Sequence, residues 1–265
     1  MMRGIAVGAV ALSLLVAGCA GVQKTEGESS RQVRLAMADQ LAQRGDWAGA
    51  FQIVDGLTRE DPTDATALLF RAKVLRKQAM TAESEADLRR VLQLEPRFAE
   101  AHSELGVLCE HAARPQEAME RHQEAKRLSP ADPRYLNNLG FAMVIRGRAK
   151  DAIPLLEEAL RAVPGNARLR NNMGFAMAST GDFGRAAEQF RLGGTPQQAT
   201  INLGFAYERS GNLAQAYQLY LQAVRLDPAE PRARSNLEHV AREMGRELPP
   251  ELAVGAPGAG EKGGG

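Results

Sequence analysis

Residue types that mark several common protein classes are scarce in this sequence of 265 residues. Aromatic residues make up 5%, with a single Trp, so a core has to be built mainly from Ala and Leu. Runs of Val and Ile are also few, and this argues against β-sheets. The formal net charge is +1, and a nucleic-acid binder normally shows a clear basic excess. The remaining composition, 44% hydrophobic and 25% charged, is that of a folded soluble protein.

Motifs of enzyme active sites and metal centres are absent as well. The four His residues do not form HExxH, there is no Cys-rich metal spacing, and no Walker-type or dinucleotide glycine motif occurs. We therefore expect no catalytic residue, no metal, no cofactor and no small-molecule substrate. We interpret the histidines as ordinary solvated side chains. They are His102, His111, His122 and His239.

The N-terminus has the features of a secretory leader that ends in a lipid anchor. Arg3 precedes an apolar run from Gly4 to Ala17, which is shorter than the roughly 20 residues that span a bilayer. The run ends in LVAGC, and small residues before Cys19 resemble the bacterial lipobox. The resemblance implies removal of residues 1–18, acylation of Cys19 and, because Ala20 follows, sorting to the outer membrane. The alternative is an ordinary signal peptide in which Cys19 is incidental.

The segments next to this anchor follow from composition and from cysteine usage. Residues 19–30 comprise the lipidated Cys and a small, polar stretch that we predict to be a flexible tether. Cys109 is the only other cysteine, so it has no intramolecular disulfide partner once Cys19 carries lipid. We expect Cys109 to be a buried, structural free thiol.

A period of 34 residues governs the body of the chain. Prolines recur at this spacing, and the last one follows after 64 residues, which is 34 plus a shortened 30. A Leu-Gly or Met-Gly pair recurs in the same phase, and an Ala follows each of these glycines by twelve residues. The prolines are Pro62, Pro96, Pro130, Pro164 and Pro228; the glycines are Gly106, Gly140, Gly174 and Gly204.

This pattern resembles the tetratricopeptide repeat, a helix-turn-helix unit of 34 residues. The resemblance implies an all-α, right-handed superhelical solenoid with small residues where the two helices of a repeat touch. We place six repeats, a capping helix over 231–247, and a disordered Gly/Pro/Ala-rich tail over 248–265. The repeats are 31–64, 65–98, 99–132, 133–166, 167–196 and 197–230. The fifth is four residues short, which is either a hinge or a tolerated deletion.

In such arrays the first helix of each repeat lines a concave surface, and this implies a candidate binding groove. Three successive repeats carry Phe141, Phe175 and Phe205 at one groove position. Flanking positions carry Arg134, Arg168, Asn137 and Asn171, with further asparagines beside them at 138, 172, 202 and 236. A groove with aromatic anchors, an Arg row and amides for a peptide backbone is one interpretation. Inter-repeat core for the phenylalanines, and a structural role for the neighbouring asparagines, is the other. The charges do not match the Lys-Asn clamp of chaperone-binding repeats.

The layout of lipid anchor, tether and six repeats resembles bacterial pilus-assembly lipoproteins. The NNLGFAM and RNNMGFAM segments are similar to TadD-type proteins of the Flp (Tad) pilus, and type IV pilus pilotins are the next match. The resemblance implies a non-enzymatic scaffold at the periplasmic side of the outer membrane, whose partner is a secretin or pilus component. A scaffold of another envelope machine, such as exopolysaccharide export or outer-membrane protein assembly, and a recruiter of a periplasmic hydrolase stay open.

Overall fold

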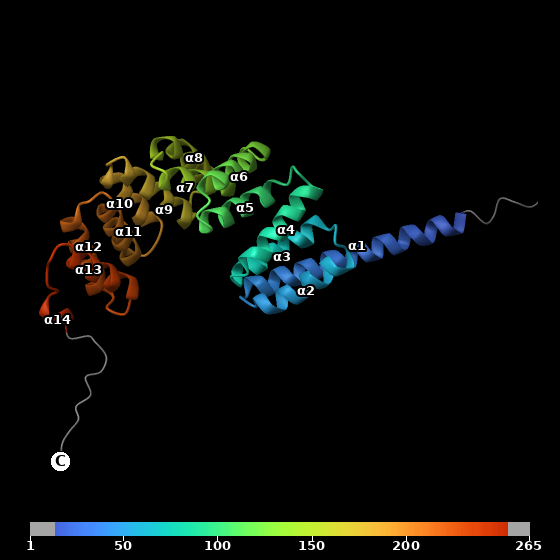
Figure 1. Ribbon diagram of the computed structural model, residues 1–265, viewed down its shortest axis with the longest axis horizontal. Coiled ribbons are helices and arrows are strands. Elements are labelled where there is room, and N and C mark those ends of the chain that lie inside the picture. The colour runs from blue at the N-terminus through green and yellow to red at the C-terminus, as the bar shows by residue number, and fades with distance from the viewer. Residues whose placement is uncertain (1–13, 254–265) are drawn as a thin grey trace, which may run out of the picture. The chain divides into compact units, whose positions relative to one another are not determined.

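The computed structural model describes residues 14–253, with side chains for residues 28–250 and Leu252. Every regular element in this part of the chain is a helix, which confirms the all-α prediction (Figure 1). Within residues 14–253, no helix is both long enough and apolar enough to cross a membrane. The chain divides into two compact units, residues 1–128 and 129–265, and each is described by itself.

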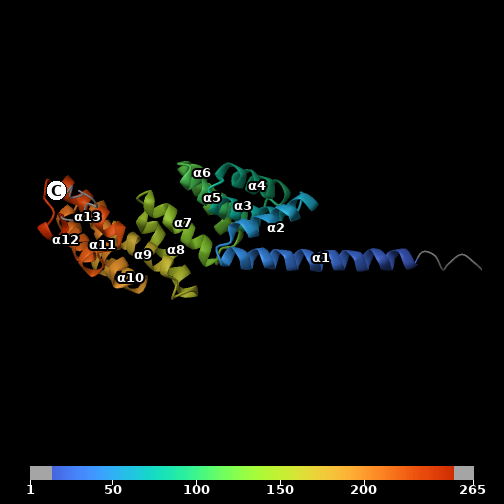
Figure 2. The same ribbon diagram turned by 90° about the horizontal axis from the view of Figure 1, so that it is seen from below.

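The first unit is built from three antiparallel helix pairs. Each odd-numbered helix packs on the even-numbered helix that follows it, and α2 and α4 also contact the next pair (Figure 1). The helices are α1 (Leu14–Gln43), α2 (Trp47–Glu60), α3 (Ala65–Lys77), α4 (Thr81–Leu94), α5 (Ala99–His111) and α6 (Pro115–Leu128). Helix α1 extends well past α2 (Figure 2), and residues 20–30, predicted to be a flexible tether, belong to it. The helix packs on α2 through Ala38, and no proline interrupts it upstream.

The second unit repeats the same arrangement and ends in a cap. Three helix pairs are followed by a thirteenth helix that packs on α12, so the last pair is covered. The helices are α7 (Pro133–Ile145), α8 (Ala149–Ala162), α9 (Ala167–Ser179), α10 (Phe183–Leu192), α11 (Pro196–Arg209), α12 (Leu213–Leu226), α13 (Pro231–Glu243) and α14 (Pro250–Ala253). One helix pair corresponds to each predicted repeat, although α1 begins before residue 31 and α11 begins at Pro196, the last residue of the predicted fifth repeat; α13 lies in the predicted capping segment.

Small residues allow the two helices of a pair to touch. A Cβ added to Gly174 of α9 would lie 2.5 Å from the ring of Phe190 on α10. The same relation holds in three other pairs, where the facing side chains come from α6, α8 and α12. These contacts explain why the sequence keeps glycine inside a helix at a propensity cost of roughly 1 kcal/mol. The pairs are Gly106 with His122, Gly140 with Leu156, and Gly204 with Tyr220.

The turn inside each pair uses a left-handed residue after the first helix. Gly45, Gly147, Gly181 and Gly211 have φ between +75° and +87° at this position, as their Gly-Asp, Gly-Arg or Gly-Asn sequences predict. The second and third pairs have no glycine there. Ala79 (φ +61°) and Ala113 (φ +53°) take the same conformation, although their Cβ atoms oppose it.

The start of the predicted C-terminal tail is ordered. Leu248 and Leu252 pack against the hydrophobic cluster of α12 and α13, and Arg234 donates a hydrogen bond to the carbonyl oxygen of Leu252 at 2.9 Å. The prediction of disorder is therefore wrong for residues 248–252, because two apolar side chains cover the outer side of the cap. Residues 254–265 lie outside the described part of the chain, as do residues 1–13 of the predicted signal peptide and the side chain of Cys19.

Candidate interaction surface

The first helices of the second unit form one continuous layer. Helix α7 contacts α9, α9 contacts α11, and α11 contacts α13, whereas α8, α10 and α12 alternate with them along the chain (Figure 1). The outward side chains of this layer are called the first-helix face below. The residues of the predicted groove all come from α7, α9 and α11. The face is defined by Arg134, Phe141, Arg168, Phe175, Gln198 and Phe205.

The three phenylalanines differ in exposure. Phe141 is 36% exposed and Phe205 is 43% exposed, whereas Phe175 is half-buried. The ring of Phe175 meets Phe205 edge-on at 5.9 Å between centroids, and it meets the fully buried Phe190 at 4.8 Å. Phe175 thus links an exposed ring to the core. The exposure of Phe141 and Phe205 agrees with the groove interpretation. The half-buried Phe175 agrees in part with the core interpretation.

The asparagines serve the packing of neighbouring repeats. Asn172 of α9 donates a hydrogen bond to Asn137 of α7 at 2.8 Å, and Asn202 of α11 donates to Asn171 at 3.2 Å. Asn137 is also buried. The prediction that Asn137 and Asn171 offer free amides to a ligand is therefore wrong, because the next repeat already occupies their oxygens. The structural interpretation of the neighbouring asparagines fits Asn172 and Asn202, which donate these bonds.

Asn171 also holds the end of the short fifth repeat against α9. Helix α10 has 10 residues where α8 and α12 have 14. Gly193 caps its end and is buried against α9, and Asn171 donates a hydrogen bond to the Gly193 carbonyl oxygen at 3.2 Å. Thr195 then starts α11 with a complete capping box to Gln198. These bonds connect the shortened end directly to the first-helix layer.

The arginines of the face are exposed but differ in their partners. Arg134 makes a two-point contact with Asp132, the N-cap of α7, at 2.8 and 3.1 Å. The hydrogen bond from Arg134 holds the pKa of Asp132 below its ordinary value. Arg168 occupies the equivalent place in α9, where the N-cap is Asn166. Among the described residues, Arg168 has no hydrogen bond and no ion pair.

The corresponding helices of the first unit present a different surface. Lys73 of α3 stands at the position of the phenylalanines, and its ammonium lies 2.9 Å from Glu100 of α5. Arg76, one turn later, pairs with Glu104 at the same distance. Charged side chains that pair with one another leave no aromatic anchor there. Within the described residues, exposed aromatic side chains occur on first helices only in the second unit, whereas α1 of the first unit exposes Val33 and Met37.

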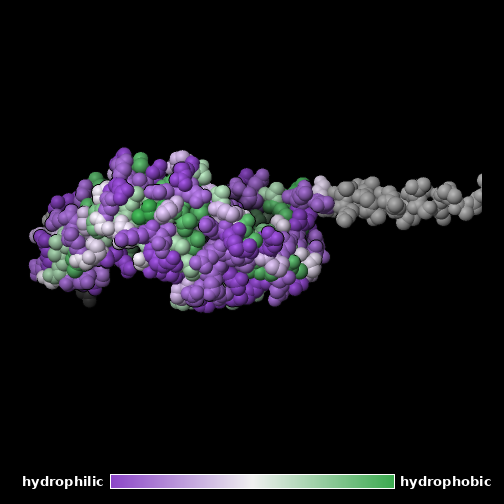
Figure 3. Space-filling model, turned by 90° about the horizontal axis from the view of Figure 1, so that it is seen from above, coloured by the Kyte–Doolittle hydropathy of each residue, from purple (hydrophilic) through white to green (hydrophobic). Residues whose placement is uncertain are grey.

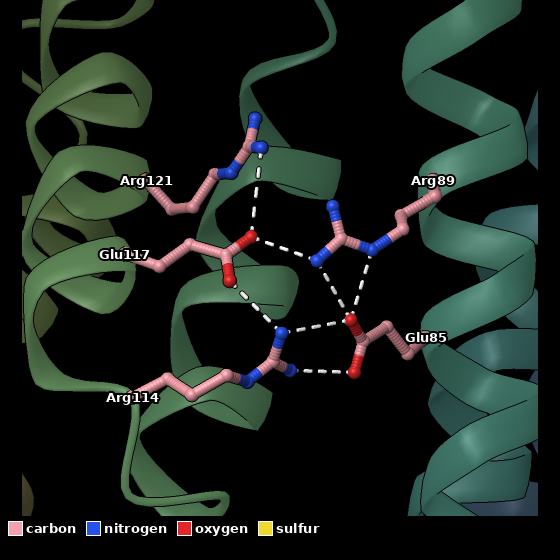
Figure 4. Close-up of polar contacts among 5 residues, drawn as sticks. All are labelled: Glu85, Arg89, Arg114, Glu117 and Arg121. Atoms are coloured by element: carbon pink, nitrogen blue, oxygen red, sulfur yellow. Dashed lines mark hydrogen bonds and ion pairs between the residues drawn. The ribbon is translucent and has the colours of Figure 1, made fainter.

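A charged network joins α4 and α6 in the first unit (Figure 4). Glu85 lies 2.5 Å from Arg114 and 2.7 Å from Arg89, while Glu117 lies 2.9 Å from each of these arginines. Arg121 lies 3.6 Å from the same Glu117 oxygen that Arg89 contacts. Hydrogen bonds from Arg114 and Arg89 lower the pKa of Glu85, and those of Arg89 contribute to the lowered pKa of Glu117. Each carboxylate in this network is paired with arginines, so the network stabilises the contact between α4 and the start of α6.

Cys109 and two of the four histidines are buried, whereas His111 and His239 are exposed. Cys109 is free and buried, as predicted, and burial raises the pKa of its thiol to about 11. His122 is fully buried and His102 is 6% exposed, so the prediction of solvated side chains is wrong for both. The ring of His122 packs on Gly106, as Phe190 packs on Gly174 in a later repeat. The Nε2 atom of His122 lies 3.5 Å from Glu110. No group of His, Cys, Asp and Glu in the described part could hold a metal ion.

Polar residues predominate on the face of the molecule that Figure 3 shows. Figure 3 shows one face of the molecule, on which hydrophilic residues surround separate hydrophobic areas. Two exposed apolar side chains of the first-helix layer lie one turn apart on α7, Phe141 at 36% and Ile145 at 51%. Together with Phe205 on α11, they make the first-helix face the candidate interaction surface of the chain.

Comparison with known proteins gives both sequence and structural matches. Tetratricopeptide repeat family models match residues 71–133, 143–199 and 198–230, which together exceed half of the chain. No protein of curated description matches the sequence. Among solved structures, PilW, described as a type IV pilus biogenesis factor, is similar with a TM-score of 0.66 and 19% identity, over 78% of this chain and 98% of that one.

Two further structures show the same fold. PilF of Pseudomonas aeruginosa has a TM-score of 0.63 at 20% identity, over 82% of this chain and 98% of that one. YrrB, described as a tetratricopeptide repeat protein with an unusual peptide-binding site, has a TM-score of 0.52 at 21% identity, over 70% and 97%. Repeats of this type are typically non-enzymatic modules that bind proteins. The paired helices, their Gly and Ala contacts and the family matches agree, and the chain belongs to the tetratricopeptide repeat family.

Proposed function

We propose that this protein is a scaffold that binds a segment of a partner protein on the first-helix face. The observation that carries the proposal is the exposure of Phe141 and Phe205, at 36% and 43%, on one layer of helices. Aromatic side chains supply much of the energy at protein interfaces. Among its described residues the first unit has ion-paired Lys73 and Arg76 on the equivalent helices and no exposed aromatic side chain, so the second unit is the better surface for a partner.

The setting we propose is the assembly of a pilus or secretin complex at the outer membrane. The lipobox at Cys19 supports a membrane anchor, and the fold likeness to PilW, a type IV pilus biogenesis factor, supports this class of machine. In this proposal the acyl chains hold the array on the periplasmic side of the membrane, each buried CH₂ contributing about 0.8 kcal/mol. The partner is then a secretin subunit or another assembly component.

The binding surface is tested by purification from solubilised envelopes with a matched pair of variants. Phe205→Ser removes an exposed ring from the face, whereas Leu226→Ser removes an exposed side chain from α12, where Leu226 is 54% exposed. We expect wild type and Leu226→Ser to retain a secretin or pilus subunit, and Phe205→Ser to lose it. Equal retention by both variants would contradict the proposed face. Retention of an exopolysaccharide-export protein, an outer-membrane assembly factor or a hydrolase would contradict the pilus setting.

The anchor is tested separately by metabolic labelling with a radioactive fatty acid. Wild-type protein should take up label and sediment with membranes, and Cys19→Ser should do neither. A wild-type chain without label would refute the lipid anchor and leave the binding surface unaffected, because the described face begins more than a hundred residues later in the sequence.

A further inference from the structure

Arginines recur at one position of the first helices in the second unit. Each is the second residue of its helix and is exposed: Arg134 in α7, Arg168 in α9 and Arg232 in α13. Arg134 and Arg168 precede Phe141 and Phe175 by seven residues, which is two helical turns or about 10 Å along the axis. Each arginine therefore shares a helix face with the ring position that follows it.

Two of these three cations are neutralised by the residue that caps their own helix. Asp132, the N-cap of α7, binds the Arg134 guanidinium at 2.8 Å, and Glu230, the N-cap of α13, binds Arg232 at 2.9 Å. The N-cap of α9 is Asn166, an amide without charge, which accepts a hydrogen bond from the Leu169 amide. Arg168 consequently has no carboxylate partner among the described residues. It stands in the middle first helix, the one that also carries Phe175.

We propose that the first-helix face selects a partner segment in which an acidic residue accompanies apolar residues; this rests on the function proposed above. The segment's carboxylate binds the Arg168 guanidinium, and its apolar side chains cover Phe205 and Phe141. A guanidinium presents paired donors that match the two oxygens of a carboxylate. The neighbouring asparagines are already bonded to one another, so charge at Arg168 and contact with the rings determine the choice of ligand.

The N-caps provide variants that alter this charge without touching the contact residues. Asn166→Asp gives Arg168 the internal partner that Asp132 gives Arg134. Asp132→Asn is the converse change, because it removes the carboxylate that pairs with Arg134. Asp and Asn are equally good N-caps, so both helices keep their capping bond. A matched control is Arg161→Gln, because Arg161 is exposed on α8, away from the face, and this change lowers the net charge by the same unit.

The test is a selection from a random-peptide phage library on the immobilised full chain. Peptides retained by wild type and lost on Phe205→Ser define ligands of the face, and we expect Asp or Glu together with apolar residues to be enriched among them. For such a peptide, made synthetically with blocked termini, Asn166→Asp should weaken binding about fivefold, as should replacing its acidic residue by Gln. Arg161→Gln should leave binding unchanged, and Asp132→Asn should not weaken it.

The outcomes separate this inference from the function on which it rests. If no retained peptide depends on Phe205, the face is not a binding surface, and both proposals fail. If Phe205-dependent peptides carry no acidic residue, or if Asn166→Asp binds them as wild type does, the charge selection fails alone. Equal weakening by Asn166→Asp and Arg161→Gln would show a general charge effect and would also overturn the role of Arg168.

Discussion

Replacing Ala113 by Gly should stabilise the first unit, although alanine is the better helix former. Ala113 follows α5 with φ of +53°, where the other turns of this type have glycine near +80°. The left-handed conformation costs an L-residue about 1–2 kcal/mol, because its Cβ approaches the next carbonyl oxygen. Glycine also destabilises the folded state by about 0.5–1 kcal/mol, because it has more conformational freedom in the unfolded chain. The expected gain in the free energy of unfolding is therefore about 0.5–1 kcal/mol, and Ala79→Gly should behave alike.

Urea unfolding followed by tryptophan fluorescence measures this effect. Trp47 is the only tryptophan of the chain and lies in the first unit, with Lys77 5.7 Å from its ring centroid. Ala86→Gly is the matched control, because Ala86 is exposed inside α4 and its replacement should lower the free energy of unfolding by about 1 kcal/mol. An Ala113→Gly midpoint that falls as the control does would refute the assignment of backbone strain to this turn.

Three further outcomes follow from packing, charge and burial. Gly174→Ala should destabilise the second unit by about 1–3 kcal/mol in thermal or urea unfolding, since the new Cβ would lie 2.5 Å from Phe190; Phe190→Leu in the same chain should recover part of the loss. The lowered pKa of Glu85 means that its contribution to stability is present above its unfolded pKa and lost as pH falls through the folded value, so an acid titration of Trp fluorescence should show a smaller loss in Arg114→Ala. Cys109, with a pKa of about 11, should resist a thiol reagent at neutral pH until the chain is unfolded, and rapid native labelling would contradict its burial.

The helices and their turns were predictable because each depends on residues that are close in the sequence. The Gly-Asp and Gly-Arg pairs mark the turns at Gly181 and Gly147, which have the positive φ that such pairs favour. The spacing of Gly174 and Phe190 predicts that the Phe190 side chain packs against Gly174, where a Cβ would otherwise lie. The phenylalanines were also placed on the correct helices, although their exposure was open.

The sequence alone determined the period, the helix pairs, the small residues at their contacts and the layer that carries Phe141, Phe175 and Phe205. Tertiary structure decided how those side chains are used, because that depends on what the neighbouring element places over them. Asn137 is closed off by Asn172, 35 residues later, and Phe175 is half-buried because Phe190 and Phe205 both reach it. A helical period identifies a face, whereas the solvent exposure of that face is set by contacts between residues far apart in the chain.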